Sequence, residues 1–279
     1  MKTRYLLLSS FVIAIGLALP VSAQTGSGST GNGSVSTSSP TVSITGSTWS
    51  ATSVERAAMQ NALDAFVSSK TSTNEAQKLA LGKVLVQKEI AVRQAAMTKL
   101  LTICSNLKIG DAAGATTSAQ INAAQTSLSA QLAQAGQLTS SDQVKSLVTQ
   151  VIETNRVFTI ASPAIRGECN GNYISYKITN TIGPLVAKLK AMGSDTTKLE
   201  GYLANSKTAA TSAIATYKQA YDDRSSAPTA VLTKANDELK SAASSLDLAA
   251  AEAKILIDAH NSTATGSGTT ATSTPVTTQ

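Results

Sequence analysis

The stretch from residue 53 to residue 261 has two properties that strongly limit its secondary structure. Apolar side chains recur there at spacings of three and four, and only three of the chain's six prolines fall within it, Pro163, Pro184 and Pro228. Such spacings place side chains on one face of a helix, and the abundant Ala, Leu, Lys and Gln favour helix formation. The sequence therefore predicts an all-α fold, built as an elongated set of antiparallel helical hairpins or as a bundle.

The most regular helix is predicted between Thr73 and Gly110. Ser72-Thr73-Asn74-Glu75 has the form of a capping box at its start, and Gly110 ends it. If Lys83 and Arg93 fill two missing places, an alternating three-four pattern runs for about four heptads, as in a coiled coil. Its apolar members are Leu79, Val86, Ile90, Met97, Leu100, Cys104 and Leu107. We expect this helix to pack on a partner.

Further helices are predicted along the rest of this stretch. The first of them begins near Ser53. The others are predicted at Gly114 to Gly136, Asp142 to Ile160, Cys169 or Asn172 to Met192, Asp195 to the turn at Ser225, and Pro228 to His260. The helix from Gly114 to Gly136 has a narrow apolar stripe among small residues, which predicts close packing; the stripe consists of Ile121, Ala124, Leu128 and Leu132.

Two prolines and a β-branched run make the middle of the chain harder to interpret. The run Val157-Phe158-Thr159-Ile160 favours a strand, so the end of its helix stays ambiguous. Pro163 is expected to break or restart the chain. Pro184 removes a backbone donor inside a helix, which predicts a bend between Asn180 and Gly183.

The first 23 residues have the features of a signal peptide. Lys2 and Arg4 precede an apolar run from Leu6 to Leu19, and small residues end at Ala23. A helix of that run covers roughly 21 Å, less than the ~30 Å of a bilayer core, so we expect cleavage and no stable transmembrane segment. Gln24 follows the expected cleavage site, where a lipoprotein anchor would need cysteine. The protein is expected to be secreted or extracytoplasmic, and association with the cell surface is one form that this location could take.

The remaining ends of the chain differ sharply from the helical stretch. Residues 24–52 and 262–279 are rich in Ser and Thr, and they contain no charged residue. Such segments bury too little apolar surface to offset the entropy lost on ordering, so both are predicted to be disordered. The predicted organisation is a signal peptide at 1–23, a linker at 24–52, a helical domain at 53–261 with a subdivision near 137–141 or 161–168, and a tail at 262–279.

The charge pattern argues against nucleic acid as a partner. Without Lys2 and Arg4, 21 of the 23 basic residues remain against 17 acidic ones. Both signs are interleaved along the helices, as is typical of solvated helix faces. A nucleic-acid-binding protein would concentrate its basic residues on one surface.

The two cysteines, Cys104 and Cys169, form the strongest chemical pair in the sequence. An exported chain with an even number of cysteines favours a disulfide. Closing a loop of this length stabilises a fold by about 4 kcal/mol in the loop-entropy model. The alternative is a buried free Cys104 on the apolar seam and an unrelated, exposed Cys169.

Catalytic and metal-binding patterns are missing from the sequence. His260 is the only histidine, so a paired-histidine zinc site is excluded, and neither His-Glu-x-x-His nor Gly-x-Ser-x-Gly occurs. We therefore predict no catalytic residue, no metal site and no cofactor, and expect the protein not to be an enzyme.

Five tyrosines cluster in the segment from residue 173 to residue 221. They are Tyr173, Tyr176, Tyr202, Tyr217 and Tyr221. If a hairpin turn is centred on Ser194, Tyr173 and Tyr217 meet across it. The tyrosines either fill an Ala-rich interface with their hydroxyls at its rim, or form a face that binds sugar or peptide. Trp49 is either a docking residue or the first contact of the linker with the helices.

A pattern from about residue 156 to residue 223 resembles uncharacterised secreted helical-hairpin proteins of bacteria with reduced genomes. It consists of Arg156-Val157-Phe158, then Pro163, Arg166 and Gly167, a helix ending before Gly193-Ser194-Asp195, and an Ala-rich helix. The chain departs from the pattern at Glu168-Cys169-Asn170-Gly171-Asn172. The resemblance implies a helical hairpin and assigns no catalytic residue.

These observations predict a structural or interaction protein outside the cytoplasm. It would dock a helix face on an envelope or extracellular protein, and self-association is one form of such docking. The alternative is a binding module for a wall glycan or small molecule at the tyrosine-rich hairpin, and a third class is an enzyme or enzyme inhibitor.

Overall fold

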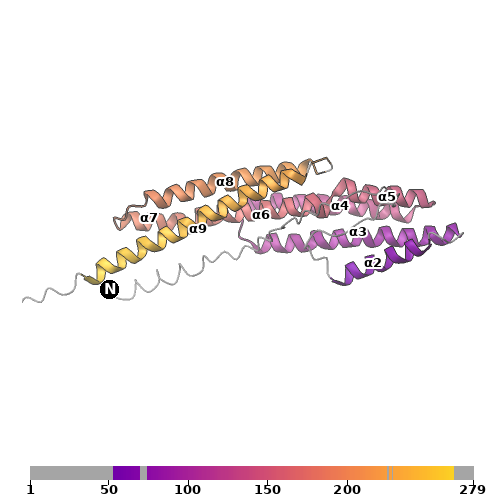
Figure 1. Ribbon diagram of the computed structural model, residues 1–279, viewed down its shortest axis with the longest axis horizontal. Helices are drawn as coiled ribbons and strands as arrows, with labels where there is room; N and C mark the ends of the chain where they lie inside the picture. Colours follow the sequence, from indigo (N-terminus) through magenta and orange to yellow (C-terminus); the bar gives the residue numbers. More distant parts are fainter. Residues whose placement is uncertain (1–52, 70–73, 225, 228, 267–279) are drawn as a thin grey trace, which may run out of the picture. The chain divides into compact units, whose positions relative to one another are not determined.

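The computed structural model describes residues 53–69, 74–224, 226–227 and 229–266, all within one compact unit that spans Trp49–Gln279. Every regular element in these ranges is helical, which confirms the all-α prediction. The α-helices are α2 (Ser53–Ser68), α3 (Glu75–Asn106), α4 (Asp111–Gly136), α5 (Ser141–Asn155), α6 (Ser162–Lys177), α7 (Gly183–Ala191), α8 (Thr197–Asp222) and α9 (Thr229–Gly266) (Figure 1). The predicted signal peptide, the linker with Trp49, and residues 267–279 lie outside the described residues.

Helix α3 is the central element of the N-terminal part and contacts α2, α4, α5 and α6. Its predicted seam is buried at Val86, Ile90, Met97, Leu100 and Cys104 and half-buried at Leu79 and Leu107. The helix begins at Glu75, two residues later than predicted, because the side chain of Asn74 accepts the backbone N–H of Gln77 at 3.0 Å.

The two charged residues predicted within this seam are both accommodated. Arg93 is buried, forms an ion pair with Glu89, and places its guanidinium 5.1 Å from the centre of the Phe158 ring. Lys83 extends to the end of α4, where its Nζ donates to the carbonyl oxygen of Gly136 at 3.2 Å. The seam therefore tolerates charge where a partner or a helix end lies within reach.

Helix α4 confirms part of its predicted stripe and corrects another part. Ile121, Ala124 and Leu128 are buried, but Leu132 is 38% exposed. Gln131 takes the inward position, because its Oε1 accepts from Asn155 Nδ2 at 2.8 Å. A buried hydrogen bond between two amides thus replaces the expected apolar contact.

The strand-favouring run Val157–Ile160 is part of a π-helical turn, η3 (Val157–Ala161), which leads directly into α6. The chain changes direction earlier, at Arg156, whose φ of 38° and ψ of 43° put it in the left-handed region and end α5. Pro163 does not break the chain, because it occupies the first turn of α6, where a missing N–H costs little.

Helix α6 begins well before the predicted Cys169 or Asn172. Two glycines that argue against helix are required by packing. A Cβ added to Gly167 would lie 2.1 Å from the ring of Tyr217, and one added to Gly171 would lie 2.6 Å from Ile214. Close helix packing therefore occurs between α6 and α8 at these two glycines.

A second π-helical turn, η4 (Ile178–Ile182), lies where the bend before Pro184 was predicted. Gly183 and Pro184 then start α7, so the proline again occupies a first turn. The wider π-helical turn absorbs the local irregularity without interrupting the helical path from α6 to α7.

The last two helices form an antiparallel hairpin (Figure 1). Its inward residues alternate at spacings of three and four on both helices: Leu199, Leu203, Ser206, Ala210, Ala213, Tyr217 and Ala220 on α8, and Leu232, Ala235, Leu239, Ala242, Leu246, Ala249 and Ala253 on α9. Ser206 Oγ donates to the carbonyl oxygen of Ala242 at 2.7 Å across this interface. Helix α9 continues to Gly266, beyond the predicted helix end at His260.

Candidate functional site

Cys104 and Cys169 form a disulfide, as the sequence predicted, and the alternative of two unrelated thiols is wrong. Their Cα atoms are 5.7 Å apart, and the bond joins the end of α3 to the middle of α6. Both side chains are buried, at 2% and 0% exposure. The bridge is therefore part of the core, and it fixes α6 against α3.

A small polar cluster is buried beside this bridge. Glu168 is 3% exposed, and one of its carboxylate oxygens accepts from Gln120 Nε2 at 3.0 Å. Burial raises the pKa of Glu168, and the hydrogen bond from Gln120 offsets this only in part. Gln120 Oε1 is buried without a hydrogen-bond partner. The cluster supports the packing of α4 on α6.

Two of the five predicted tyrosines belong to the core, so their place in an exposed binding face is corrected. Tyr217 is 1% exposed and donates its hydroxyl to Asn236 Oδ1 at 2.6 Å. Tyr221 is 4% exposed and donates to the carbonyl oxygen of Gln120 at 2.5 Å. Burial raises the pKa of both phenols. Both residues fill the Ala-rich interface and hold α8 to its neighbours.

The other three tyrosines are half-buried, Tyr173 and Tyr176 three residues apart on α6 and Tyr202 on α8. Lys177 Nζ lies 5.4 Å from the ring centre of Tyr173, and Lys198 Nζ lies 5.9 Å from that of Tyr202. Tyr176 instead borders a pocket at the turn between α3 and α4. Only Tyr176 keeps a position from which it would contact a ligand in a cavity.

The expected meeting of Tyr173 and Tyr217 across the hairpin does not occur. The residue against the Tyr217 ring is Gly167, six positions earlier. The expectation assumed equal rise per residue on both sides of the turn. The π-helical turn η4 on the path from α6 to α7 accounts for only part of the offset, because one such turn inserts about one extra residue.

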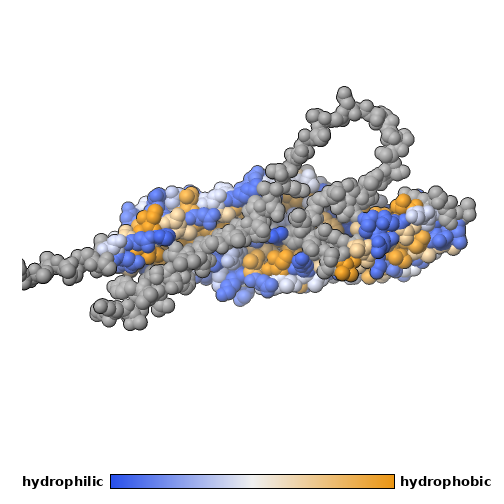
Figure 2. Space-filling view, turned by 60° about the horizontal axis from the view of Figure 1, so that its bottom comes forward, coloured by the Kyte–Doolittle hydropathy of each residue, from blue (hydrophilic) through white to orange (hydrophobic). Residues whose placement is uncertain are grey.

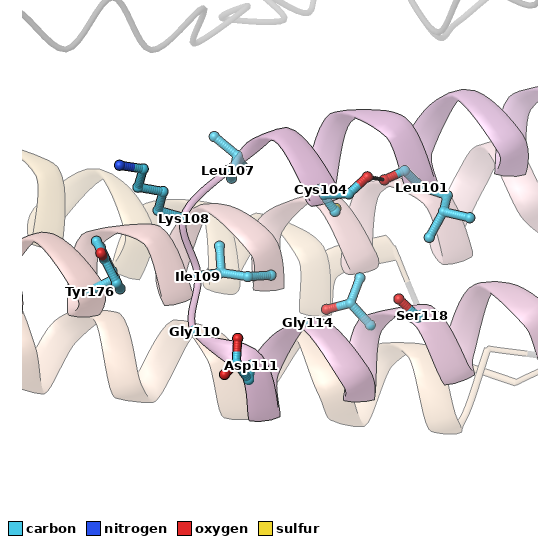
Figure 3. A pocket seen from close by; sticks show the side chains of 12 residues that line it. Leu101, Cys104, Leu107, Lys108, Ile109, Gly110, Asp111, Gly114, Ser118 and Tyr176 are labelled. Atoms are coloured by element: carbon cyan, nitrogen blue, oxygen red, sulfur yellow. Dashed lines mark hydrogen bonds between the residues drawn. The ribbon is translucent and has the colours of Figure 1, made fainter.

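The pocket beside Tyr176 has a volume of about 440 Å³. The last turns of α3, the connection at residues 107–110 and the first turns of α4 enclose it (Figure 3). Its wall combines apolar side chains with Lys108 and Asp111 from the connection and the start of α4. From the sequence, Gly110 was expected only to end a helix, and a single glycine carries no signal for a cavity.

The C-terminal half of α9 has a second apolar stripe that faces away from α8. Leu248 is 50% exposed and Ile255 is 58% exposed, and Ala251 and Ala259 lie on the same face. We call these four residues the outer stripe. Lys198 in the first turn of α8 pairs with Glu252 at 2.8 Å, so the part of α9 after Glu252 runs past the start of α8 (Figure 1).

The surface otherwise alternates between apolar and hydrophilic residues. On the face that Figure 2 presents, small apolar patches are separated by hydrophilic residues. In the described ranges, no helix is long and apolar enough to span a bilayer, and no three His, Cys, Asp or Glu side chains are grouped so that they could hold a metal ion. His260 lies in α9, half-buried.

Comparison with known protein families, curated proteins and solved structures finds no match.

Proposed function

We propose that this protein is an exported, non-enzymatic structural protein that works by docking a helix face. Two features support export: the signal-peptide pattern of residues 1–23 and the core disulfide, which needs an oxidising compartment to form and persist. The buried tyrosine hydroxyls and the Glu168–Gln120 pair serve packing, which supports a role for the exterior of the bundle.

The observation that carries this proposal is the outer stripe of α9. Its residues are spaced by three and four, so they repeat the pattern by which α9 packs on α8, but on a different face. Leu248 and Ile255 are the two large side chains of the stripe, and both are at least half exposed. A second helix with a similar stripe would cover them by coiled-coil pairing.

The charges beside the stripe favour a second copy of this chain as that partner. Asp247 precedes Leu248 and Lys254 precedes Ile255, so the two opposite charges lie on the same flank, seven residues apart. In an antiparallel two-fold pairing, Leu248 would face Ile255 of the second copy, and Asp247 would face its Lys254 twice by symmetry. Lys254 pairs with Asp258 at 2.6 Å within α9, but both side chains are more than half exposed, so this bond exchanges at little cost.

The oligomeric state tests the docking proposal. Sedimentation equilibrium of the purified protein over a range of concentrations should show a monomer–dimer equilibrium. Leu248→Asp with Ile255→Asp should abolish the dimer and leave the melting temperature within error, because both side chains are exposed. Val84→Asp on α3, where Val84 is 42% exposed, is the matched control and should leave the dimer intact.

Charge reversal distinguishes specific pairing from general stickiness. Asp247→Lys and Lys254→Asp should each weaken the dimer, and the double variant should restore it. A protein that stays monomeric at every concentration would rule out the second copy as the partner. A dimer that is indifferent to the stripe variants would rule out this face.

Fractionation of the producing cells tests export. The protein should be recovered outside the cytoplasm and shortened at its N-terminus by the length of the signal segment. Recovery of the unprocessed chain from the cytosol would contradict the proposal.

A further inference from the structure

The pocket at the α3–α4 turn is held open by the geometry of its walls. The disulfide of Cys104 fixes the last turn of α3, and Gly110, with a φ of 84°, turns the chain into α4. One turn further, Gly114 faces the pocket, and a Cβ added there would have no atom within 4 Å. A glycine at this point of a helix leaves a space that any other side chain would enter.

One part of the pocket wall is apolar. Leu101 and Leu107 are half-buried and Ile109 is 9% exposed, and the Ile109 side chain lies in the middle of the group in Figure 3. Tyr176 from α6 closes one side with its ring and hydroxyl. The volume of about 440 Å³ falls within the ~300–1,000 Å³ of small-molecule sites.

Two opposite charges border this apolar space. Lys108 on the connection and Asp111 at the start of α4 are both exposed and line the pocket. Because the connection is not helical there, the two side chains do not meet, and neither is in an ion pair with another residue of the described part of the chain. A ligand that carries both charges would satisfy them together.

We propose that this pocket binds a small zwitterion with an apolar side chain, the chemistry that free amino acids and short peptides share. Lys108 and the Tyr176 hydroxyl take the carboxylate, and Asp111 takes the ammonium group. The apolar side chain enters among Leu101, Leu107 and Ile109. This site is separate from the outer stripe of α9. The ligand proposal therefore goes beyond the docking function and is tested independently of it.

Isothermal titration calorimetry of the purified protein tests the ligand class. The probes are leucine, leucyl-leucine and the uncharged N-acetyl-leucine amide, with glucose as a polar compound that lacks both charges and an apolar side chain. Saturable binding of leucine or leucyl-leucine is expected, and the tighter of the two identifies the source as free amino acid or peptide. Failure of both zwitterions to bind, or equal binding of the uncharged amide or of glucose, would overturn the proposal.

Variants locate the binding in this pocket. Gly114→Leu places a side chain in the open space and should weaken binding at least about tenfold. Gly201→Leu is the matched control, because Gly201 is also helical with no atom within 4 Å of an added Cβ, but it lies on α8 outside the pocket. Circular dichroism melts should show both variants folded, and Gly114→Ala provides a milder change at the same position.

Charge neutralisation tests the two assigned contacts. Lys108→Gln and Asp111→Asn should each lower the affinity for the zwitterion roughly fivefold. Neither variant should change any residual binding of the uncharged amide. Binding that survives Gly114→Leu at full affinity, or that ignores both charge variants, would place the ligand elsewhere and refute the assignment.

Discussion

Glu168 shows how one buried carboxyl couples this fold to pH. Its pKa is raised above the ordinary 4.5 because burial disfavours the charged form; Lys218 lowers it and Asp222 raises it to a smaller extent. A raised folded-state pKa means that the folded protein holds this proton more tightly than the unfolded chain does. The contribution of this proton to the free energy of unfolding is complete below about pH 4.5, and it is lost as the pH rises through the folded-state pKa of Glu168.

Glu168→Gln is predicted to remove this dependence. A glutamine keeps the acceptor for Gln120 Nε2 and adds a donor for the unpartnered Gln120 Oε1. The variant should match the wild type near pH 4 and exceed it by about 1–2 kcal/mol at pH 8. Urea denaturation between these pH values measures the difference, and Glu153→Gln on exposed α5 surface is the control. A difference that does not grow with pH would contradict the prediction.

Two helical glycines, Gly167 on α6 and Gly201 on α8, should respond in opposite directions to substitution by alanine. Gly167→Ala would push a methyl group into the Tyr217 ring, which cannot move because its hydroxyl is held by Asn236, and should cost about 3 kcal/mol. Gly201→Ala has open space in α8 and should add about 1 kcal/mol through helix propensity. Urea midpoints of the two variants provide the test, and a tolerated Gly167→Ala would show that α6 and α8 are not so closely packed.

Arg156 connects three elements at the end of α5. Its side chain donates to the carbonyl oxygens of Ala227 at 2.5 Å and Arg224 at 3.3 Å, so it satisfies the backbone of the α8–α9 turn. It does so from a left-handed backbone conformation, which costs a non-glycine residue roughly 1–2 kcal/mol. The hydrogen bonds outweigh that strain in the folded protein.

Replacements at Arg156 should separate the two contributions. Arg156→Ala loses the hydrogen bonds and keeps the strain, so it should destabilise by about 2–3 kcal/mol. Arg156→Gly loses the same hydrogen bonds but relieves the strain, so it should destabilise the protein by about 1 kcal/mol less than Arg156→Ala does. Thermal melts should rank the wild type first, glycine second and alanine last. The reverse order of the two variants would mean that strain at this position is negligible.

The elements that sequence could predict are those whose own side chains repeat the helical period. The α3 seam, the α8 start near Asp195 and the disulfide all follow from local pattern or pairing. The start of α6 could not be predicted, because Gly167 and Gly171 disfavour a helix in the sequence. Their reason is the close packing of Tyr217 and Ile214 from α8, which only the structure shows. The pocket could not be predicted either, because it depends on distant segments: Tyr176 lies 66 positions after Gly110 of the α3–α4 connection.

At the scale of the whole molecule, the disulfide should supply a large share of the stability. It closes a loop of 65 residues, worth about 4 kcal/mol in the loop-entropy model. The double variant Cys104→Ala with Cys169→Ala should therefore unfold at much lower urea concentration than the oxidised wild type. Reductant should bring the wild type close to the variant and leave the variant unchanged. Equal midpoints under oxidising conditions would show that helix packing alone fixes α6 on α3.

The same bond also decides how the chain would carry mechanical tension. A pull on the two ends passes from α3 through the sulfur atoms to α6, so the intervening α4 and α5 bear no load. The 65 bridged residues could otherwise lengthen by about 220 Å when stretched, and this length stays locked while the sulfurs are joined. A protein tethered between two surfaces would thus yield in the helices outside this loop, while α4 and α5 stay free of tension.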